Sequence, residues 1–347
     1  MLAVAVVLAL TIAGCGDDDA PTAESPAALT VMTWNVYVGA EVQNVLRVTN
    51  DEELAEVASG LVISLETTDF RDRADALAGA IVAHSPDLVA LQEVALWRTQ
   101  EPSDPLSESK DVLVDFLTVL LEAVSTRGGD YEAVAVSTNV DAEVGTGDRD
   151  VRLTDRDVIL ARSDRVEPWQ ITGSASTFET NLSLESPLGG DFTVERGWAA
   201  ADLRIDGAPV RVFSTHLEVP PFNGIQAAQA EELIEEIEQA DGLVVLAGDF
   251  NSPAEDALTP TYGLLRDAGL VDAWQALELP AGPTCCHQDG LRGPSQLDAR
   301  IDLVLVSPTA TTVSAERVGA SPEERSPAGR WPSDHAGVVA TIAIGGG

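Results

Sequence analysis

The stretch LVVLAGDFNSPAED, residues 243–256, decides how the fold is interpreted. A run of apolar residues long enough to cross a sheet ends in Gly248, Asp249, Phe250 and Asn251, and Pro253 follows. Gly, Asp and Asn are ordinary turn residues and a proline helps to stop a strand, so this stretch alone fits a turn as well as a site. The rest of the chain must distinguish the two interpretations.

Short apolar runs alternate with helical patterns along nearly the whole chain. Strands are predicted over 29–33, 88–91, 131–137, 157–161, 199–205, 210–214, 243–247, 301–306 and 338–344. Apolar residues at helical spacing predict helices over 74–81, 113–124 and 230–237. No linker divides residues 29–344, so we expect one α/β domain with sheets covered by helices.

The charge of the chain restricts its partners. Its 347 residues include 57 acidic and 20 basic side chains, for a formal net charge of −37. Such a surface repels polyanions and offers no basic stripe for nucleic acid or anionic lipid. A phosphate-bearing substrate would therefore need a bound cation in order to approach.

The N-terminus predicts export. Its apolar run is too short to span a bilayer, breaks at Gly14 and Cys15, and is followed by acidic, Pro/Ala-rich sequence, although no basic residue precedes it. LTIAGC resembles a bacterial lipobox, which implies cleavage before Cys15, a lipid anchor on its sulfur, and residence at the cell envelope; a plain secretory signal is the alternative. We expect a signal peptide over 1–15, a flexible tether over 16–28 and a folded domain over 29–344.

Polar residues gather where the predicted strands end. TWN ends in Asn35, LQE in Glu93 and STH in His216, GDFN supplies Asp249 and Asn251, RID supplies Asp302, and SDH supplies Asp334 and His335. Turn preferences do not account for a glutamate after an apolar run or for two of only four histidines at strand ends. These blocks, in this order over residues 33–335, resemble the signature of the endonuclease/exonuclease/phosphatase superfamily.

The resemblance implies a fold and a reaction. The fold would be a four-layer α/β sandwich, in which two mixed β-sheets pack face to face between helices and the site lies where strand ends converge. The reaction would be hydrolysis of a phosphoester assisted by a divalent cation, which we expect to be Mg²⁺, with Mn²⁺ or Ca²⁺ as alternatives.

The chemistry of the side chains agrees with that reaction. Glu93 and Asn35 offer hard oxygen ligands suited to Mg²⁺ or Ca²⁺. Asp302 can accept a hydrogen bond from His335, which would make His335 a general base or a stabiliser of a phosphate oxygen. By resemblance, Asp249 positions or deprotonates the attacking water, Asn251 binds the phosphoryl group, Asp334 joins the metal ligands, and His216 faces the phosphate and can protonate the leaving group.

Several positions depart from the family pattern or remain open. Tyr37 stands where abasic-site endonucleases carry an acidic residue, which favours a site with one metal. Arg156 is a phosphate contact or half of an internal ion pair, and Arg196 is a similar phosphate candidate. Segment 39–70 could form a lid that chooses the substrate.

The remaining histidines and cysteines have structural interpretations. His84 is read as structural and His287 as a loop residue. Cys285 and Cys286 are expected to form a vicinal disulfide, with free thiols or a metal role beside His287 as alternatives.

These observations predict a metal-dependent phosphodiesterase that acts outside the cytoplasm as a monomer. Its substrate would be a small phosphoester or a phospholipid head group, and an extracellular nuclease is the alternative within the same family. A further alternative is a catalytically inactive envelope lipoprotein that binds a phosphorylated ligand or a protein partner.

Overall fold

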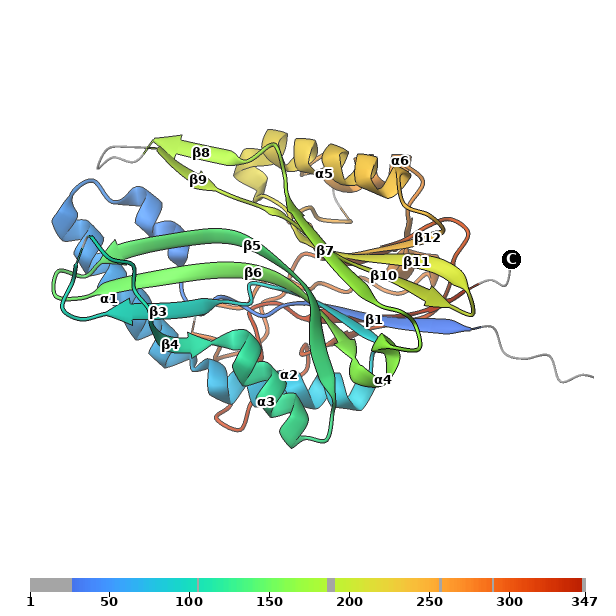
Figure 1. Cartoon of the computed structure of the whole chain (residues 1–347), viewed down its shortest axis with the longest axis horizontal. Helices are drawn as coiled ribbons and strands as arrows, with labels where there is room; N and C mark the ends of the chain where they lie inside the picture. Colours follow the sequence, from blue (N-terminus) through green and yellow to red (C-terminus); the bar gives the residue numbers. More distant parts are fainter. Residues whose placement is uncertain (1–26, 105, 186–190, 256–257, 289, 345–347) are drawn as a thin grey trace, which may run out of the picture.

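The computed structural model describes residues 27–104, 106–185, 191–255, 258–288 and 290–344. The predicted signal segment, Cys15 and most of the predicted tether lie outside the described residues. Within them, two mixed β-sheets pack face to face and helices cover their outer sides (Figure 1). The predicted four-layer α/β sandwich is confirmed. None of the described helices combines the length and the apolar character needed to cross a membrane.

The larger sheet contains both the first and the last strands of the domain. Its order is β15 (Thr311–Val318), β16 (Gly337–Ala343), β1 (Ala28–Asn35), β2 (Leu88–Gln92), β6 (Asp150–Arg162), β3 (Leu96–Gln100) and β4 (Asp111–Asp115), and β5 (Tyr131–Gly145) also pairs with β6. β1 runs parallel to β2 and antiparallel to β16.

The second sheet repeats this arrangement around another parallel pair, β11 and β12. Its order is β13 (Val271–Asp272), β14 (Asp302–Val306), β12 (Leu243–Asp249), β11 (Ala208–His216), β10 (Gly197–Ile205) and β7 (Thr172–Thr177). A small hairpin of β8 (Leu182–Glu185) and β9 (Asp191–Val194) lies beside it (Figure 1).

Helices connect the parallel strands and form the outer layers. They are α1 (Asp51–Thr68), α2 (Phe70–His84), α3 (Phe116–Thr126), α4 (Ser163–Val166), α5 (Asn223–Glu238), α6 (Thr261–Asp267) and α7 (Ala273–Ala276), with 3₁₀ turns at Val42–Arg47, Pro220–Phe222 and Pro322–Glu324. α2 and α3 lie on the outer face of the larger sheet, and α5 lies on the outer face of the second (Figure 1).

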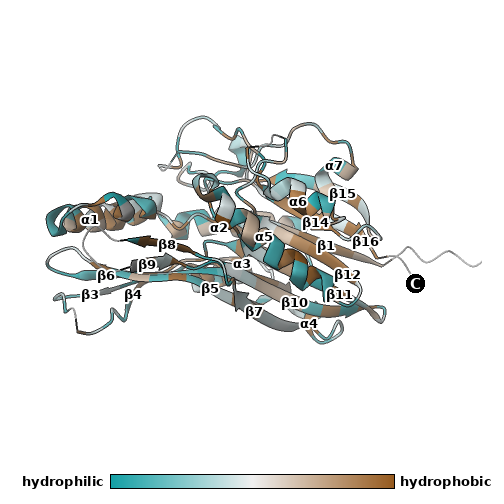
Figure 2. Ribbon diagram, turned by 90° about the horizontal axis from the view of Figure 1, so that it is seen from above, coloured by the Kyte–Doolittle hydropathy of each residue, from teal (hydrophilic) through white to brown (hydrophobic). Residues whose placement is uncertain are grey.

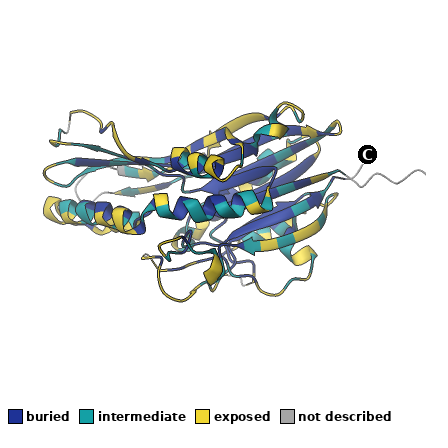
Figure 3. Ribbon diagram, turned by 90° about the horizontal axis from the view of Figure 1, so that it is seen from below, coloured by how far each residue is buried: buried dark blue, intermediate teal, exposed yellow. Residues whose placement is uncertain are grey.

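Three apolar clusters correspond to the three interfaces between these layers. One joins α2 and α3 to the larger sheet, one lies between the sheets, and one joins α5 and α6 to the second sheet. The central strands are accordingly strongly hydrophobic (Figure 2) and buried, while the helices expose their outer sides (Figure 3). Three of the five glutamates of α5 are exposed, as the glutamate-rich pattern over 231–238 predicts, whereas Glu232 and Glu236 are half-buried.

The helix predicted over 113–124 is wrong at its start. The first residues of this range belong to strand β4, because Val112 pairs with Arg98 of β3, and Leu113 therefore lies in a strand. α3 begins at Phe116, where the side chain of Asp115 accepts a hydrogen bond from the backbone N–H of Leu117 and caps the helix.

Candidate active site

The two parallel pairs bring their polar ends to one edge of the sandwich. In the larger sheet Asn35 at the end of β1 is level with Gln92 at the end of β2, and Glu93 follows directly. In the second sheet His216 at the end of β11 is level with Asp249 at the end of β12. Parallel strands end on the same side, so residues far apart in sequence become neighbours.

The antiparallel neighbours of each pair bring the remaining residues to the same edge. Asp302 begins β14 directly opposite Asp249. His335 lies just before β16, whose first residues pair with the end of β1. Trp34 fixes this approach, because its indole N–H donates to the carbonyl oxygen of His335 at 2.9 Å.

Gly248 explains the glycine of the GDFN block. Its backbone lies against Thr215 of β11, and a Cβ at this position would overlap the Thr215 carbonyl oxygen. Glycine therefore lets β12 approach β11 closely, immediately before Asp249. The GDFN block is therefore the end of a strand that carries site residues. Its glycine allows the close packing against β11 that places them.

His335, Asp302, Asp249 and His216 form one buried cluster. Nδ1 of His335 lies 2.8 Å from Oδ2 of Asp302 and 3.8 Å from Oδ2 of Asp249. Nε2 of His216 lies 3.5 Å from the same oxygen of Asp249. Asp249 thus stands between two imidazoles, and Asp302 orients one of them.

The surroundings push the pKa values of the two histidines in opposite directions. Burial lowers the pKa of His335, but Asp302, Asp249 and Asp334 outweigh it and hold that pKa well above its usual range. Burial, Arg196 and His335 together hold the pKa of His216 well below its usual range. These directions favour the protonated form of His335 and the neutral form of His216.

Asp249 is poised between its two protonation states. Burial raises its pKa to about 6, although His335 acts in the opposite direction. Its Oδ1 accepts a hydrogen bond from the backbone N–H of Asn251 at 2.9 Å. The amide nitrogen of Asn251 donates to the carbonyl oxygen of Leu217, which fixes the side chain beside the second sheet's strand ends.

Asn35 links this cluster to Glu93. Its amide nitrogen donates to Oε1 of Glu93 at 2.9 Å and to Oδ2 of Asp249 at 3.0 Å, while its oxygen accepts from the backbone N–H of Tyr37. The other carboxylate oxygen of Glu93 accepts from the backbone N–H of Val38 at 2.6 Å. The two sheets therefore share one polar network.

The residues around Glu93 fit a divalent cation. Burial, Asp334 and Asp155 raise the pKa of Glu93 to about 7, and burial also raises the pKa of Asp334. Several carboxylates in a buried space repel one another, and a cation with oxygen preference would relieve that repulsion. Glu93, Asp334 and, after rotation of its amide, Asn35 are the side chains that would hold the ion.

Three residues at this edge adopt left-handed backbone conformations. Tyr37, Glu93 and Asn251 have φ values of 60°, 58° and 49°. Each conformation costs on the order of 1–3 kcal/mol for a residue other than glycine. Each follows a strand end and turns the chain sharply there, so the strain is concentrated in the residues that build the site.

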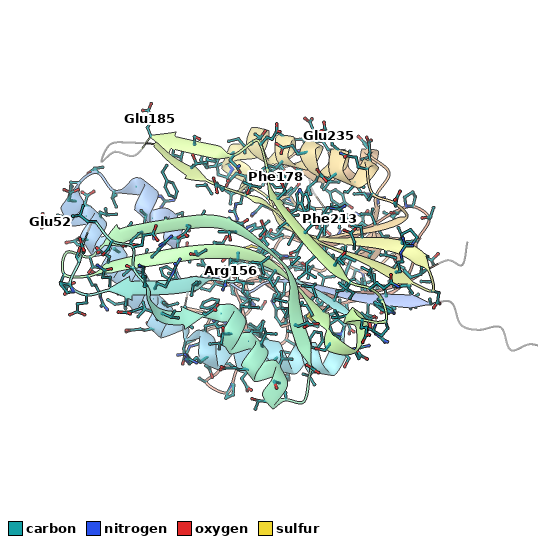
Figure 4. All side chains as sticks on the ribbon, viewed as in Figure 1. Glu52, Arg156, Phe178, Glu185, Phe213 and Glu235 are labelled. Atoms are coloured by element: carbon teal, nitrogen blue, oxygen red, sulfur yellow. A yellow bond between two sulfur atoms is a disulfide. The ribbon has the colours of Figure 1, made fainter. Side chains whose placement is uncertain are left out.

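The two candidate arginines have different surroundings, Arg156 on β6 of the larger sheet and Arg196 just before β10 of the second sheet. Arg156 donates to the carbonyl oxygen of Val94 at 2.9 Å and pairs with Asp115, so the internal ion pair is the interpretation that the structure favours (Figure 4 labels Arg156 on β6). Arg196, by contrast, lies 3.9 Å from Glu218 and acts electrostatically on His216 and Glu93.

Sequence reasoning missed two residues that assemble the site. The fully buried Arg73 of α2 donates to the carbonyl oxygens of Val36, Tyr37, Thr68 and Pro332 and so joins the loop after β1 to the SDH loop. Ser333 donates to the carbonyl oxygen of Asn35 at 2.6 Å. The helical pattern starting at residue 74 gave no reason to expect a buried arginine one position earlier.

The cysteines and the remaining histidines lie as follows. Cys285 and Cys286 are joined in a disulfide, and the sulfur of Cys286 lies 3.8 Å from Nε2 of His335. His287 is buried and stacks on Trp331 with ring centroids 4.2 Å apart. His84 is half-buried, with its Nδ1 3.0 Å from Oε1 of Glu316, and its structural role stays a prediction.

Segment 39–70 folds into a 3₁₀ turn and α1. Leu61, Val62 and Leu65 bury the inner side of α1, and the hydroxyl of Thr68 donates to the carbonyl oxygen of Gly39. The residue before the segment, Val38, donates its backbone N–H to Glu93, so the segment begins beside the site. Its role as a lid stays a prediction.

Solved structures share this architecture. An endonuclease/exonuclease/phosphatase from Bacteroides vulgatus superposes with a TM-score of 0.56 at 18% identity, over 92% of this chain and 100% of that one. One from Beutenbergia cavernae gives a TM-score of 0.52 at 22% identity, over 92% of this chain and 72% of that one. TDP2 of D. rerio, complexed with single strand DNA product, gives a TM-score of 0.52 at 17% identity, over 92% of this chain and 100% of that one. At these identities the likeness concerns the fold.

The family model decides the relationship. No curated protein matches the chain. The model of the endonuclease/exonuclease/phosphatase family matches residues 32–335, which contain every strand-end block described above. The chain is thus a member of the endonuclease/exonuclease/phosphatase family and a metal-dependent phosphoesterase.

Proposed function

We propose that the protein is a Mg²⁺-dependent phosphodiesterase whose site consists of His335, Asp302, Asp249, His216, Asn251, Glu93, Asn35, Asp334 and Arg196. The observation that carries the proposal is the position of Asp249, within reach of both histidines and of the Asn35 amide that also binds Glu93. One carboxylate thereby joins the proposed catalytic cluster to the proposed metal ligands.

The directions of the pKa shifts indicate a different role for each of these residues. Asp249, with a pKa of about 6, is ionised at neutral pH and can accept a proton from the attacking water. The raised pKa of His335 favours its protonated form, so we assign His335 to stabilising a phosphate oxygen and Asp249 to the role of base. Asp302 keeps the imidazolium in place through the 2.8 Å contact with Nδ1.

The remaining residues bind and orient the phosphate. Asn251 has a second amide N–H free of its contact with Leu217 and would direct it at the phosphoryl group. Arg196 supplies a buried positive charge. Neutral His216 holds Asp249 and is a poor acid for the leaving group, which modifies the role that the resemblance implies. A divalent cation bound by Glu93, Asp334 and Asn35 would neutralise charge on the phosphate and on the leaving oxygen.

The proposed substrates are small phosphodiesters or phospholipid head groups outside the cytoplasm. The net charge of −37 opposes tight binding of a polynucleotide. The lipobox-like sequence at Cys15 supports anchoring at the cell envelope, and we propose that the enzyme acts there as a monomer.

The test is hydrolysis of bis(p-nitrophenyl) phosphate by the full chain with Mg²⁺, Mn²⁺, Ca²⁺ or EDTA. We expect metal-dependent turnover that falls by about 10²–10⁴ in His335→Ala and in Asp249→Ala. His84→Ala, a histidine outside the site, is the matched control and should keep the full rate. Unchanged rates in both site variants would refute the assignment. Comparable rates on DNA and on small diesters would favour the nuclease alternative.

A further inference from the structure

A second group of buried oxygens lies behind Arg196, between the two sheets. Asp155 and Asp157 alternate along β6 with Arg156, so they share the face of Ile159 and Ala161, which pack between the sheets. Asn139 lies in an irregularity of β5, between the partners of Arg156 and Thr154. Such bulges redirect a side chain, and here the Asn139 amide nitrogen donates to Oδ2 of Asp155 at 3.3 Å.

Most of the oxygens in this group have no hydrogen-bond donor among the described residues. Oδ1 of Asn139, Oδ1 of Asp155 and both carboxylate oxygens of Asp157 are buried and make no hydrogen bond of ordinary geometry there, although the Asn139 side chain acts on Asp157 as well as on Asp155. The three side chains are 1%, 8% and 0% exposed. Leaving a buried polar atom without a partner costs about 1–3 kcal/mol, and more for a charged one, so four such atoms together call for a ligand.

The positive charge nearby does not balance the group. Arg196 acts on Asp155, Asp157, Glu93 and Glu218 at once, so a single guanidinium serves four carboxylates. Burial also raises the pKa of both Asp155 and Asp157, which reflects the cost of holding their charges without a counterion. An anionic phosphoester bound to Arg196 would be repelled by these carboxylates, which act on the same arginine.

We propose that Asp155, Asp157 and, after rotation of its amide, Asn139 bind a second divalent cation beside the ion at Glu93. Carboxylate and amide oxygens are the ligands of Ca²⁺ and Mg²⁺, and retained waters would complete the coordination. The ion would satisfy the unpartnered oxygens and release Arg196 to face the phosphate. The geometry of this site does not depend on the proposed reaction, although its usefulness to catalysis rests on the proposed function.

The test counts bound ions without substrate. The full chain is titrated with Mn²⁺, and free Mn²⁺ is measured by electron paramagnetic resonance. We expect two ions per wild-type chain, one in Asp157→Asn and one in Glu93→Gln. Asp202→Asn, a partly exposed aspartate of β10 paired with Arg211, is the matched control and should retain two. A single ion in the wild type, or two in Asp157→Asn, would overturn the proposal.

The same variants separate this proposal from the proposed function. Loss of an ion in Asp157→Asn but not in Glu93→Gln would support the second site and contradict the metal ligands proposed for catalysis. Asp157→Asn removes a buried charge at nearly constant shape, so in EDTA this variant should have a higher melting temperature than the wild type. Added Mn²⁺ should raise the melting temperature of the variant less than that of the wild type. If that variant does not fold, Asn139→Ala removes a neutral ligand only and should weaken the second ion's Kd about tenfold. An unchanged Kd in Asn139→Ala would then count against the site.

Discussion

The sulfur of Cys286 lies 3.8 Å from Nε2 of His335, the ring nitrogen that does not face Asp302. The disulfide therefore lies beside the ring nitrogen that remains for a phosphate oxygen. Cys286 is exposed, while Cys285 is buried, so a reductant can reach the bond from the Cys286 side.

Reduction of this disulfide is expected to slow the enzyme. A dithiol such as dithiothreitol would be oxidised as it converts the bond to two thiols, and a Cys286 thiolate beside protonated His335 would pair with Nε2. We expect kcat to fall about tenfold, a barrier increase of ~1.4 kcal/mol. Initial rates with and without dithiothreitol measure the effect. Cys286→Ser should be insensitive to the reductant, and an equal loss in this variant would exclude the mechanism.

The rate should rise with pH through about 6. Asp249 must be ionised to accept a proton, and its pKa is raised to about 6. His335 has a pKa held well above its usual range, so its protonated form persists through neutral pH and the decline should come on the alkaline side. The profile of kcat/KM between pH 4.5 and 9 checks this, and a flat profile between pH 5 and 7 would contradict the role of Asp249.

Arg196→Met should reduce activity, whereas Arg156→Met should reduce stability. Arg196 lies with Glu218, His216 and Glu93, so its loss should reduce kcat/KM by about 10–100-fold through weaker phosphate binding. Arg156 pairs with Asp115, so its loss should lower the melting temperature and leave kcat/KM within about twofold. Steady-state kinetics and thermal melts of both variants decide between these outcomes, and the reverse pattern would reassign the phosphate contact.

His287 should make the protein sensitive to acid. Burial, Arg325 and His335 lower its pKa from 6.5 to about 4. A histidine whose folded pKa is depressed contributes stability above pH 6.5 that is lost as the pH falls toward 4, because the unfolded chain takes up the proton first. The expected loss is roughly 2 kcal/mol between pH 6.5 and pH 5. Urea unfolding at both pH values measures it.

His287→Gln should reduce this pH dependence, because glutamine does not titrate. His84→Gln, at the surface, is the control and should behave like the wild type. A pH dependence that survives unchanged in His287→Gln would place its origin elsewhere.

The sequence predicted the framework and the strand-end residues because both follow from local patterns. Apolar runs set the strands, and a polar residue after such a run, as at Glu93 or His216, has few structural reasons to be there. It did not single out Asp155 and Asp157, since carboxylates between two sheets contradict the expectation that charged side chains stay exposed. The alternation 157, 159, 161 was a usable signal, because it places Asp157 on the inner face and Arg156 on the outer one.

Arg73 could not be predicted, for a different reason. Its four backbone acceptors come from segments 68, 36–37 and 332, whose proximity exists only in the folded chain. Only the start of the helix predicted over 113–124 was wrong, and for a similar reason, since the pairing of Val112 with Arg98 of β3 overrode the local helical spacing.

The pairing of β1 with β16 joins the first strand of the domain to the last. A ribosome makes β1 first and β16 last, so the larger sheet cannot close until nearly the whole chain has been synthesised. His335 arrives with that final strand, held to Trp34 by its carbonyl oxygen. An incomplete chain released early would carry Asn35, Glu93 and Asp249 and still lack the imidazolium. Activity is thereby confined to the finished polypeptide.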